Sequence, residues 1–201
     1  MTNRKLKGNK VQDNIRLRAF FDAGERNIAG AWLALLKMNV SRAKVLEIDD
    51  MLYNETVEQF REWCKDKVLD AKMESFMLNV NLTDDDLIPI LHKRKKQIIQ
   101  AYVAKEAILI ALQNIATDFI MVLWLIHNEL GYGEKRLKKV IQFISDYEGD
   151  EKADIKEKLN ITYPDSSTLP DYSQMQQEMR QRKREQQWQN EKAAEMIAGI
   201  R

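Results

Sequence analysis

The residues best suited to recognition chemistry in this sequence are basic side chains that follow a glycine-containing turn. Gly131 and Gly133 separate an apolar segment from an amphipathic one. The basic residues of the second segment are Lys135, Arg136, Lys138 and Lys139. Ammonium and guanidinium groups at the start of a helix can contact phosphates and base edges in a major groove. The pattern therefore favours a helix-turn-helix unit that contacts nucleic acid or another partner, with the two glycines as its hinge.

The same segment also fits an ordinary helical hairpin with a solvated basic face. His127 stands where the first helix of a helix-turn-helix usually has a small residue, which lets the two helices approach. Residues 131–133 are equally typical of a helix C-cap that joins two helices of a bundle. Both interpretations leave the basic side chains on the outside.

A second basic run lies in the middle of the chain. It follows His92 and consists of Lys93, Arg94, Lys95 and Lys96. On a helix, consecutive residues spread around most of the circumference, so this run does not form a narrow stripe. We expect either phosphate contacts or a solvated helical surface here, and we include these four residues among the candidate contacts.

Patterns typical of catalysis or metal binding are not found in the sequence. Cys64 is the only cysteine, and His92 and His127 are the only histidines, which excludes an intrachain disulfide and a thiolate-rich metal site. The acidic residues 84–86 precede an apolar run, where carboxylates typically cap a helix. The sequence also lacks a glycine-rich phosphate loop and a local Ser/His/Asp or Cys/His grouping. We therefore expect a non-enzymatic protein without catalytic residues, metal or cofactor.

Composition and periodicity predict an all-α fold. The chain has 201 residues, of which 44% are hydrophobic and 31% charged, with a net charge of +1 and only 7 Gly and 3 Pro. A nearly neutral protein has no global field that attracts nucleic acid, so any basic surface must be local. The sequence shows no clear strand-like alternation. We predict a multi-helix bundle with a central apolar helix and a projecting C-terminal helix.

The chain divides into three predicted regions. Residues 1–161 form the helical bundle, with a basic N-terminal arm at 1–10; residues 162–172 hold two of the three prolines and form a linker; residues 173–201 form a polar helix. A helix this polar projects, dimerises or docks on a partner. Its candidate partner contacts are Met175, Met179, Arg182, Arg184 and Trp188. The same helix could bring copies of the chain together as a homo-oligomer.

The most apolar stretch, residues 98–126, predicts a helix in the middle of the bundle. A membrane span is not expected, because Asp118 would cost about 2.5–3.5 kcal/mol near the centre of a bilayer. Residues 86–130 form either one helix or two, with a break near Thr117 and Asp118 if there are two. Upstream, the spacing of apolar residues between 57 and 71 predicts one continuous helix with Cys64 on its buried stripe.

Residues 125–137, LIHNELGYGEKRL, resemble a recurrent pattern of the form L-x-H-[DN]-E-[FL]-G-[FY]-G-x-K-R-L. This pattern is typical of short helical proteins of unknown activity encoded by phages and prophages of Gram-positive bacteria. In those proteins an amphipathic helix follows, and then a short helix similar to residues 154–161. The resemblance covers residues 119–162 and implies a phage protein that acts in the cytoplasm of its host.

Three functions remain open at this stage. We favour a phage-encoded protein that binds a protein partner, as a regulator or as an inhibitor of a host defence component. The alternative is a nucleic-acid-binding regulator that uses the helix-turn-helix segment. A third possibility is an oligomeric virion or assembly component. The absence of an N-terminal secretory pattern favours the host cytoplasm for all three.

Overall fold

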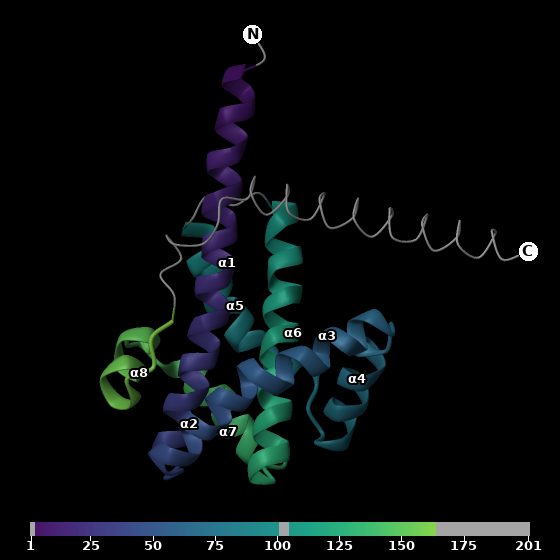
Figure 1. Cartoon of the computed structure of the whole chain (residues 1–201), viewed down its shortest axis with the longest axis vertical. Coiled ribbons are helices and arrows are strands. Elements are labelled where there is room, and N and C mark those ends of the chain that lie inside the picture. Colours follow the sequence, from purple (N-terminus) through teal and green to yellow (C-terminus); the bar gives the residue numbers. More distant parts are fainter. Residues whose placement is uncertain (1–2, 101–104, 164–201) are drawn as a thin grey trace, which may run out of the picture. The chain divides into compact units, whose positions relative to one another are not determined.

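A computed structural model describes the backbone of residues 3–100 and 105–163 and the side chains of residues 18–99, 108 and 111–163. The described elements are all helical, which confirms the all-α prediction. They are α1 (Asn3–Lys37), α2 (Arg42–Met51), the π-helical segment η1 (Leu52–Thr56), α3 (Val57–Lys65), α4 (Leu69–Asn79), α5 (Asp84–Gln100), α6 (Lys105–Leu130), α7 (Glu134–Asp146) and α8 (Glu151–Leu159). Figure 1 shows their arrangement.

The backbone divides into two compact units. One comprises residues 19–164, and the other comprises residues 1–18 and 165–201. Within the second unit only the first half of α1 is described, so the predicted basic arm at 1–10 falls mostly on a helix. The bundle extends beyond its predicted end at residue 161, because Tyr163 is also buried in its core. The rest of the predicted linker and the C-terminal helix lie outside the described residues.

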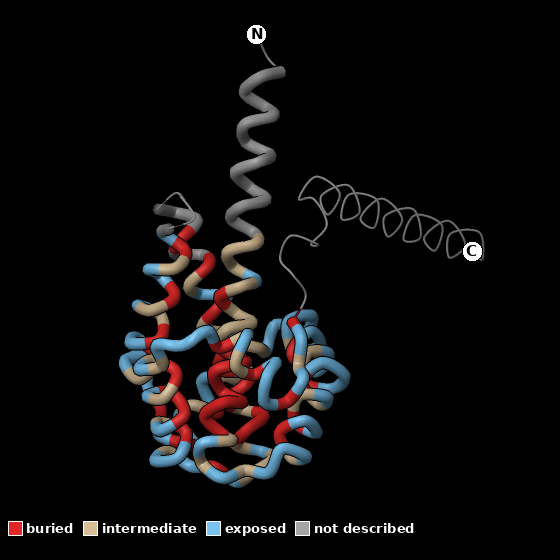
Figure 2. Tube along the Cα trace, turned by 90° about the vertical axis from the view of Figure 1, so that its left-hand side faces the viewer, coloured by how far each residue is buried: buried red, intermediate tan, exposed pale blue. Residues whose placement is uncertain are grey.

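Helix α6 is the most apolar helix of the described bundle. Its second half contributes buried side chains on several sides, among them Phe119, Leu123 and Ile126, and Figure 2 shows the buried positions concentrated in the inner helices. The open question about residues 86–130 is resolved by two helices, α5 and α6, which pack against each other. The expected break at Thr117 and Asp118 is wrong. Helix α6 continues through both residues, and the Thr117 hydroxyl donates to the Gln113 carbonyl of the preceding turn instead of starting a new helix.

Residues 57–71 also differ from the prediction of one continuous helix. Helix α3 ends at Lys65, Lys67 takes a left-handed conformation with φ of 58°, and α4 begins at Leu69. Because the chain turns here, Cys64 is exposed and not on a buried stripe. Phe60 is the residue of α3 that is buried in the bundle.

A polar network in the interior joins three helices that are far apart in sequence. Arg94 of α5 and Glu151 of α8 are 0% and 1% exposed, and their side chains meet at 3.1 Å (Nη2 to Oε1). Arg94 Nε also donates to Asn27 Oδ1 of α1 at 2.6 Å. Lys93 Nζ and Arg26 Nη1 approach the same Glu151 carboxylate at 2.9 and 3.2 Å. Three cations thus surround one buried carboxylate, which connects α1, α5 and α8.

This cluster determines the charge state of Glu151. Burial by itself would raise the pKa of Glu151, but the attraction of Arg94 and the hydrogen bond from Lys93 outweigh it, so the pKa is lowered from 4.5. A carboxylate with a lowered pKa in the folded state stabilises the fold above its unfolded pKa. That contribution is lost as the pH falls through the folded value.

We predict that Glu151→Gln lowers the free energy of unfolding by about 3 kcal/mol at neutral pH, because it leaves Arg94 buried without a counter-charge. Urea unfolding followed by circular dichroism measures this loss. As a control, Glu58→Gln, which removes a partner of an exposed ion pair with Arg61, should change stability by no more than about 0.5 kcal/mol.

The stability difference between the natural protein and Glu151→Gln should also depend on pH. It should be constant above pH 4.5 and shrink as the pH falls below that value, because only the natural carboxylate becomes protonated. A gap that persists unchanged into acid would contradict the role of the carboxylate charge. A loss equal to that of Glu58→Gln would contradict the role of burial.

Candidate macromolecular interface

Backbone conformation and a side-chain hydrogen bond both stabilise the turn between α6 and α7. Gly131 lies in the left-handed region with φ of 61°, a conformation that glycine adopts without strain. His127 Nδ1 donates to the Tyr132 carbonyl at 2.9 Å, and its ring packs against Phe76 with the centroids 5.6 Å apart. The large residue that looked out of place in a helix-turn-helix thus has a structural role, since it ties the last turn of α6 to the loop.

Helix α7 buries one face and exposes the other. Leu137, Val140, Ile141 and Ile144 lie in the core, and the helix packs against α5. Gly30 of α1 permits a close approach here, because a Cβ on it would be 3.1 Å from Ile144 Cγ1. The opposite face of α7 carries the basic residues predicted from sequence.

These basic residues differ in whether their charge is available to a binding partner. Lys135, Arg136 and Lys139 are exposed. The Arg136 guanidinium lies 5.0 Å from the centroid of the Tyr132 ring, which holds it in place without neutralising it. Lys138 instead bridges Glu134 and Asp86 at 3.1 and 3.2 Å, so its charge is already paired.

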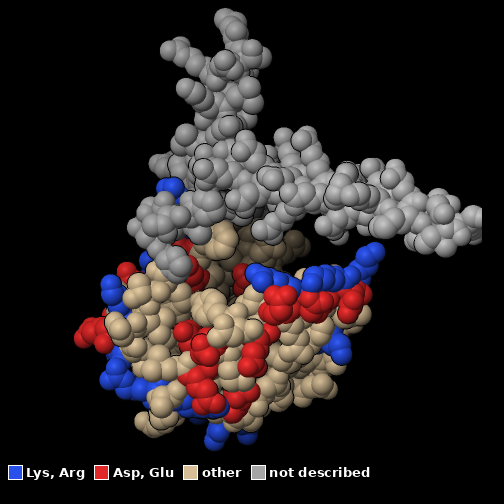
Figure 3. Space-filling model, in the orientation of Figure 1, with Lys and Arg blue, Asp and Glu red and all other residues tan. Residues whose placement is uncertain are grey.

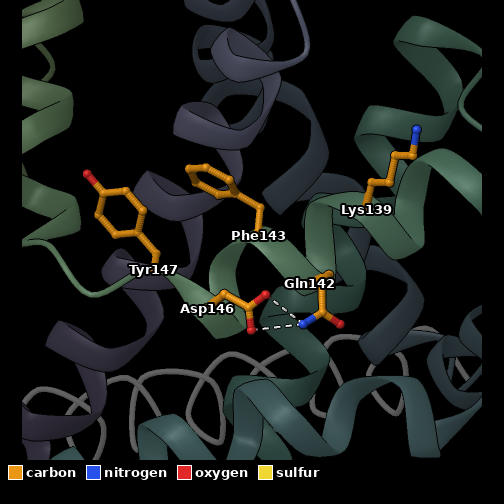
Figure 4. A pocket seen from close by; sticks show the side chains of 5 residues that line it. All are labelled: Lys139, Gln142, Phe143, Asp146 and Tyr147. Carbon is orange, nitrogen blue, oxygen red and sulfur yellow. Dashed lines mark hydrogen bonds between the residues drawn. The ribbon is translucent and has the colours of Figure 1, made fainter.

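Two shallow depressions flank this exposed face of α7. One is lined by Gly131, Gly133, Glu134, Lys135 and Arg136 at the start of the helix. The other, of about 370 Å³, is lined by Lys139, Gln142, Phe143, Asp146 and Tyr147, as Figure 4 shows. Two of its lining side chains already bind each other, because the Gln142 amide donates hydrogen bonds to both carboxylate oxygens of Asp146. Such open depressions suit contact with a macromolecular surface better than enclosure of a small molecule.

The predicted run at residues 93–96 is divided by the fold. Arg94 is completely buried against Glu151, and Lys93 donates to the carbonyls of Ile144 and Tyr147 at the end of α7. Including these two residues among surface contacts was wrong, because their positions on α5 face the bundle. Lys95 and Lys96 are exposed. The candidate contacts of the C-terminal segment, Met175, Met179, Arg182, Arg184 and Trp188, lie outside the described residues.

A second surface, formed by α2 and η1, was missed in the sequence. The inward face of these elements carries Val45, Ile48 and Leu52. Beside it lie the exposed residues Leu46, Asp50 and Tyr53 and the half-buried Asp49; we refer to these four as the α2–η1 face. Leu46 and Tyr53 are 42% and 51% exposed. The signal was present in the sequence as a Leu-x-x-Asp-Asp-x-x-Tyr spacing beside a stripe of apolar residues. The sequence does not show that the buried Trp32 indole of α1 donates a hydrogen bond to Asp49 on this face.

Of the acidic residues 84–86, Asp86 has the capping role expected from the sequence. Asp86 accepts hydrogen bonds from the backbone N–H and the hydroxyl of Thr83 at 2.9 and 3.0 Å, at the start of α5. Among the described residues, no group of His, Cys, Asp and Glu side chains could hold a metal ion.

We predict that alanine substitution of the two hinge glycines has different effects on the free energy of unfolding. Gly131→Ala should cost about 1 kcal/mol, because its φ is positive. Gly133→Ala is the matched control: this residue has an ordinary φ of −85° and open space around its missing Cβ, so stability should be unchanged or slightly higher. Thermal unfolding of both variants measures the difference. Equal effects of the two substitutions would contradict the described turn.

Comparisons with known proteins do not assign the chain to a family. No family model, no curated protein and no solved structure matches it significantly. In the part of the chain that the structure describes, none of the helices combines the length and apolarity needed to cross a membrane.

Proposed function

We propose that this protein is a non-enzymatic binding protein whose partner is another protein. The observation that carries the proposal is the α2–η1 face. It presents two large apolar side chains, Leu46 and Tyr53, with carboxylates between them. An exposed Tyr and an exposed aliphatic residue beside polar groups are typical of the contact regions of protein interfaces.

The distribution of charge also favours a protein partner over nucleic acid. Lys93 and Arg94 form ion pairs with the buried Glu151, and Lys138 is paired with Asp86 at the surface, so none of the three is free to neutralise phosphates. Figure 3 shows acidic side chains gathered in the middle of one face and a row of them beside a row of basic ones. A nucleic-acid surface would be expected to carry a broad basic patch instead.

The sequence resemblance supports a phage origin and, with it, a place of action in the host cytoplasm. In that setting we propose that the protein acts as a regulator or as an inhibitor that occupies a host or viral protein. The C-terminal segment, with its candidate contacts, would extend the binding surface. A virion component that assembles from many copies is a less supported alternative.

A second candidate function is nucleic-acid binding through α7. The specific observation in its favour is that Lys135, Arg136 and Lys139 are exposed on one helix and form no ion pair with the described residues. They lie beside the uncapped start of α7, where backbone N–H groups favour anions.

The first test is capture of a partner from host lysate, with and without nuclease. We predict that the intact chain retains its partner after nuclease treatment and that Leu46→Ala with Tyr53→Ala weakens binding by about thirtyfold or more, since truncation of interface anchors typically costs more than about 1 kcal/mol each. Leu78→Ala is the control, because Leu78 is a large exposed apolar residue on a different helix. Capture that is abolished by nuclease, or reduced equally by Leu78→Ala, would contradict the proposal.

The second test replaces Lys135, Arg136 and Lys139 together with Gln. Under the proposed function this variant keeps its captured partner at the natural level. Under the nucleic-acid alternative, binding of a labelled duplex weakens, and the slope of log affinity against log salt falls by about 0.9 for each phosphate that the variant no longer neutralises. Fluorescence anisotropy over a salt series separates the two outcomes.

A further inference from the structure

We infer that the outward face of α7 is a second binding site, which takes an acidic amphipathic helix of another protein. The site is a row of side chains spaced four residues apart, Lys135, Lys139, Phe143 and Tyr147, with Arg136 beside its first half; we refer to these five as the α7 row. The inference goes beyond the proposed function, which concerns the partner held by the α2–η1 face, and either can hold without the other.

The first observation is that the α7 row is continuous along one side of the helix. Residues four apart are neighbours on a helix surface, so the row extends over about 18 Å at about 1.5 Å per residue. A depression lies at each end, the first lined in part by Lys135 and Arg136, the second by Lys139, Phe143 and Tyr147. In Figure 4, Phe143 lies between Lys139 and Tyr147. A shallow strip of this length fits one helix that packs alongside α7.

The second observation is a surplus of positive charge in the first half of the α7 row. Lys135, Arg136 and Lys139 are exposed, and none of them forms an ion pair with the residues that the structure describes. The acidic residue at the start of α7, Glu134, is already paired with Lys138. Carboxylates of a binding partner would complement these three charges.

The third observation is apolar surface in the second half of the α7 row. Phe143 and Tyr147 are half-buried, and their ring centroids are 5.2 Å apart. The Tyr147 hydroxyl donates to Asp154, and the Lys93 ammonium lies 5.9 Å from the centroid of the Tyr147 ring. Because these contacts already hold the Tyr147 side chain, little side-chain entropy is lost when an apolar group of a partner packs against it.

The order of charge and apolar surface along the α7 row favours a protein helix over nucleic acid. Each strand of a duplex presents phosphates along its whole length, with about 3.4 Å of helix axis between them. Beside Phe143, however, the exposed Asp146 carries a negative charge whose described partner is only the neutral amide of Gln142. Phosphates would be repelled there. An amphipathic helix can place carboxylates against the first half of the row and an apolar side chain against the second.

The test measures the binding of labelled helical peptides to the intact chain by fluorescence anisotropy. The first peptide carries two Glu residues four positions apart and a Leu four positions after the second Glu, which matches the spacing of the α7 row. The second peptide has Gln in place of both Glu residues, and the third has Ser in place of the Leu. We expect the first peptide to bind saturably and the other two to bind about tenfold more weakly, because one lacks the charge pairs and the other lacks the apolar contact.

Two triple variants separate the α7 row from general electrostatics. Lys135→Gln with Arg136→Gln and Lys139→Gln should reduce affinity for the first peptide by about tenfold and leave affinity for the second unchanged. The control removes three exposed charges from α5 and α8, with Lys95→Gln, Lys96→Gln and Lys158→Gln. Its net charge changes by the same amount, yet it should bind the first peptide as the natural protein does. Each variant is first checked for a native amide spectrum.

Several outcomes would overturn the site. They are no saturable binding of the first peptide, equal binding of the second or third peptide, and an equal loss in the control variant. A labelled duplex that binds more tightly than the first peptide, and loses affinity in the α7 variant, would assign the row to nucleic acid instead. The proposed function has its own failure, which is capture that does not depend on Leu46 and Tyr53, and the peptide measurements do not bear on it.

Discussion

The ion pair between Arg94 and Glu151 is the constraint on which the rest of the bundle depends. Removing a guanidinium and a carboxylate from water is costly, and the cost is offset only if both groups meet with good geometry and further hydrogen bonds. Asn27, Lys93 and Arg26 supply those bonds from two helices, α1 and α5. The network therefore requires α1, α5 and α8 to be in place together.

Both candidate surfaces follow from that requirement. Lys93, one residue before Arg94, reaches the last carbonyls of α7 and so helps to hold the helix whose outer face is basic. Helix α8 starts at Glu151 and leads the chain to Tyr163, which is buried in the same core as Trp32.

The elements that were predicted from sequence are those with strong local signals. The apolar residues of α6 and the turn at Gly131 could be recognised because periodicity and backbone conformation act over a few residues. The prediction of one helix over residues 57–71 was wrong because it, too, relied on local spacing alone. Its apolar spacing continued through Lys67, although the backbone there turns left-handed and Val68 is exposed.

The sequence by itself determined the all-α class, the apolar character of α6 and the basic character of α7, because residue type and spacing suffice for these. Only the tertiary structure decided which charged side chains lie on the surface and which lie in the core. In the sequence, nothing distinguishes the four basic residues of the run 93–96 from one another. In the structure, Lys93 and Arg94 pair with the buried Glu151, whereas Lys95 and Lys96 face outward. The physical reason is that the partner of a buried charge can lie anywhere in the chain: Glu151 is 57 residues from Arg94, and no local pattern connects them.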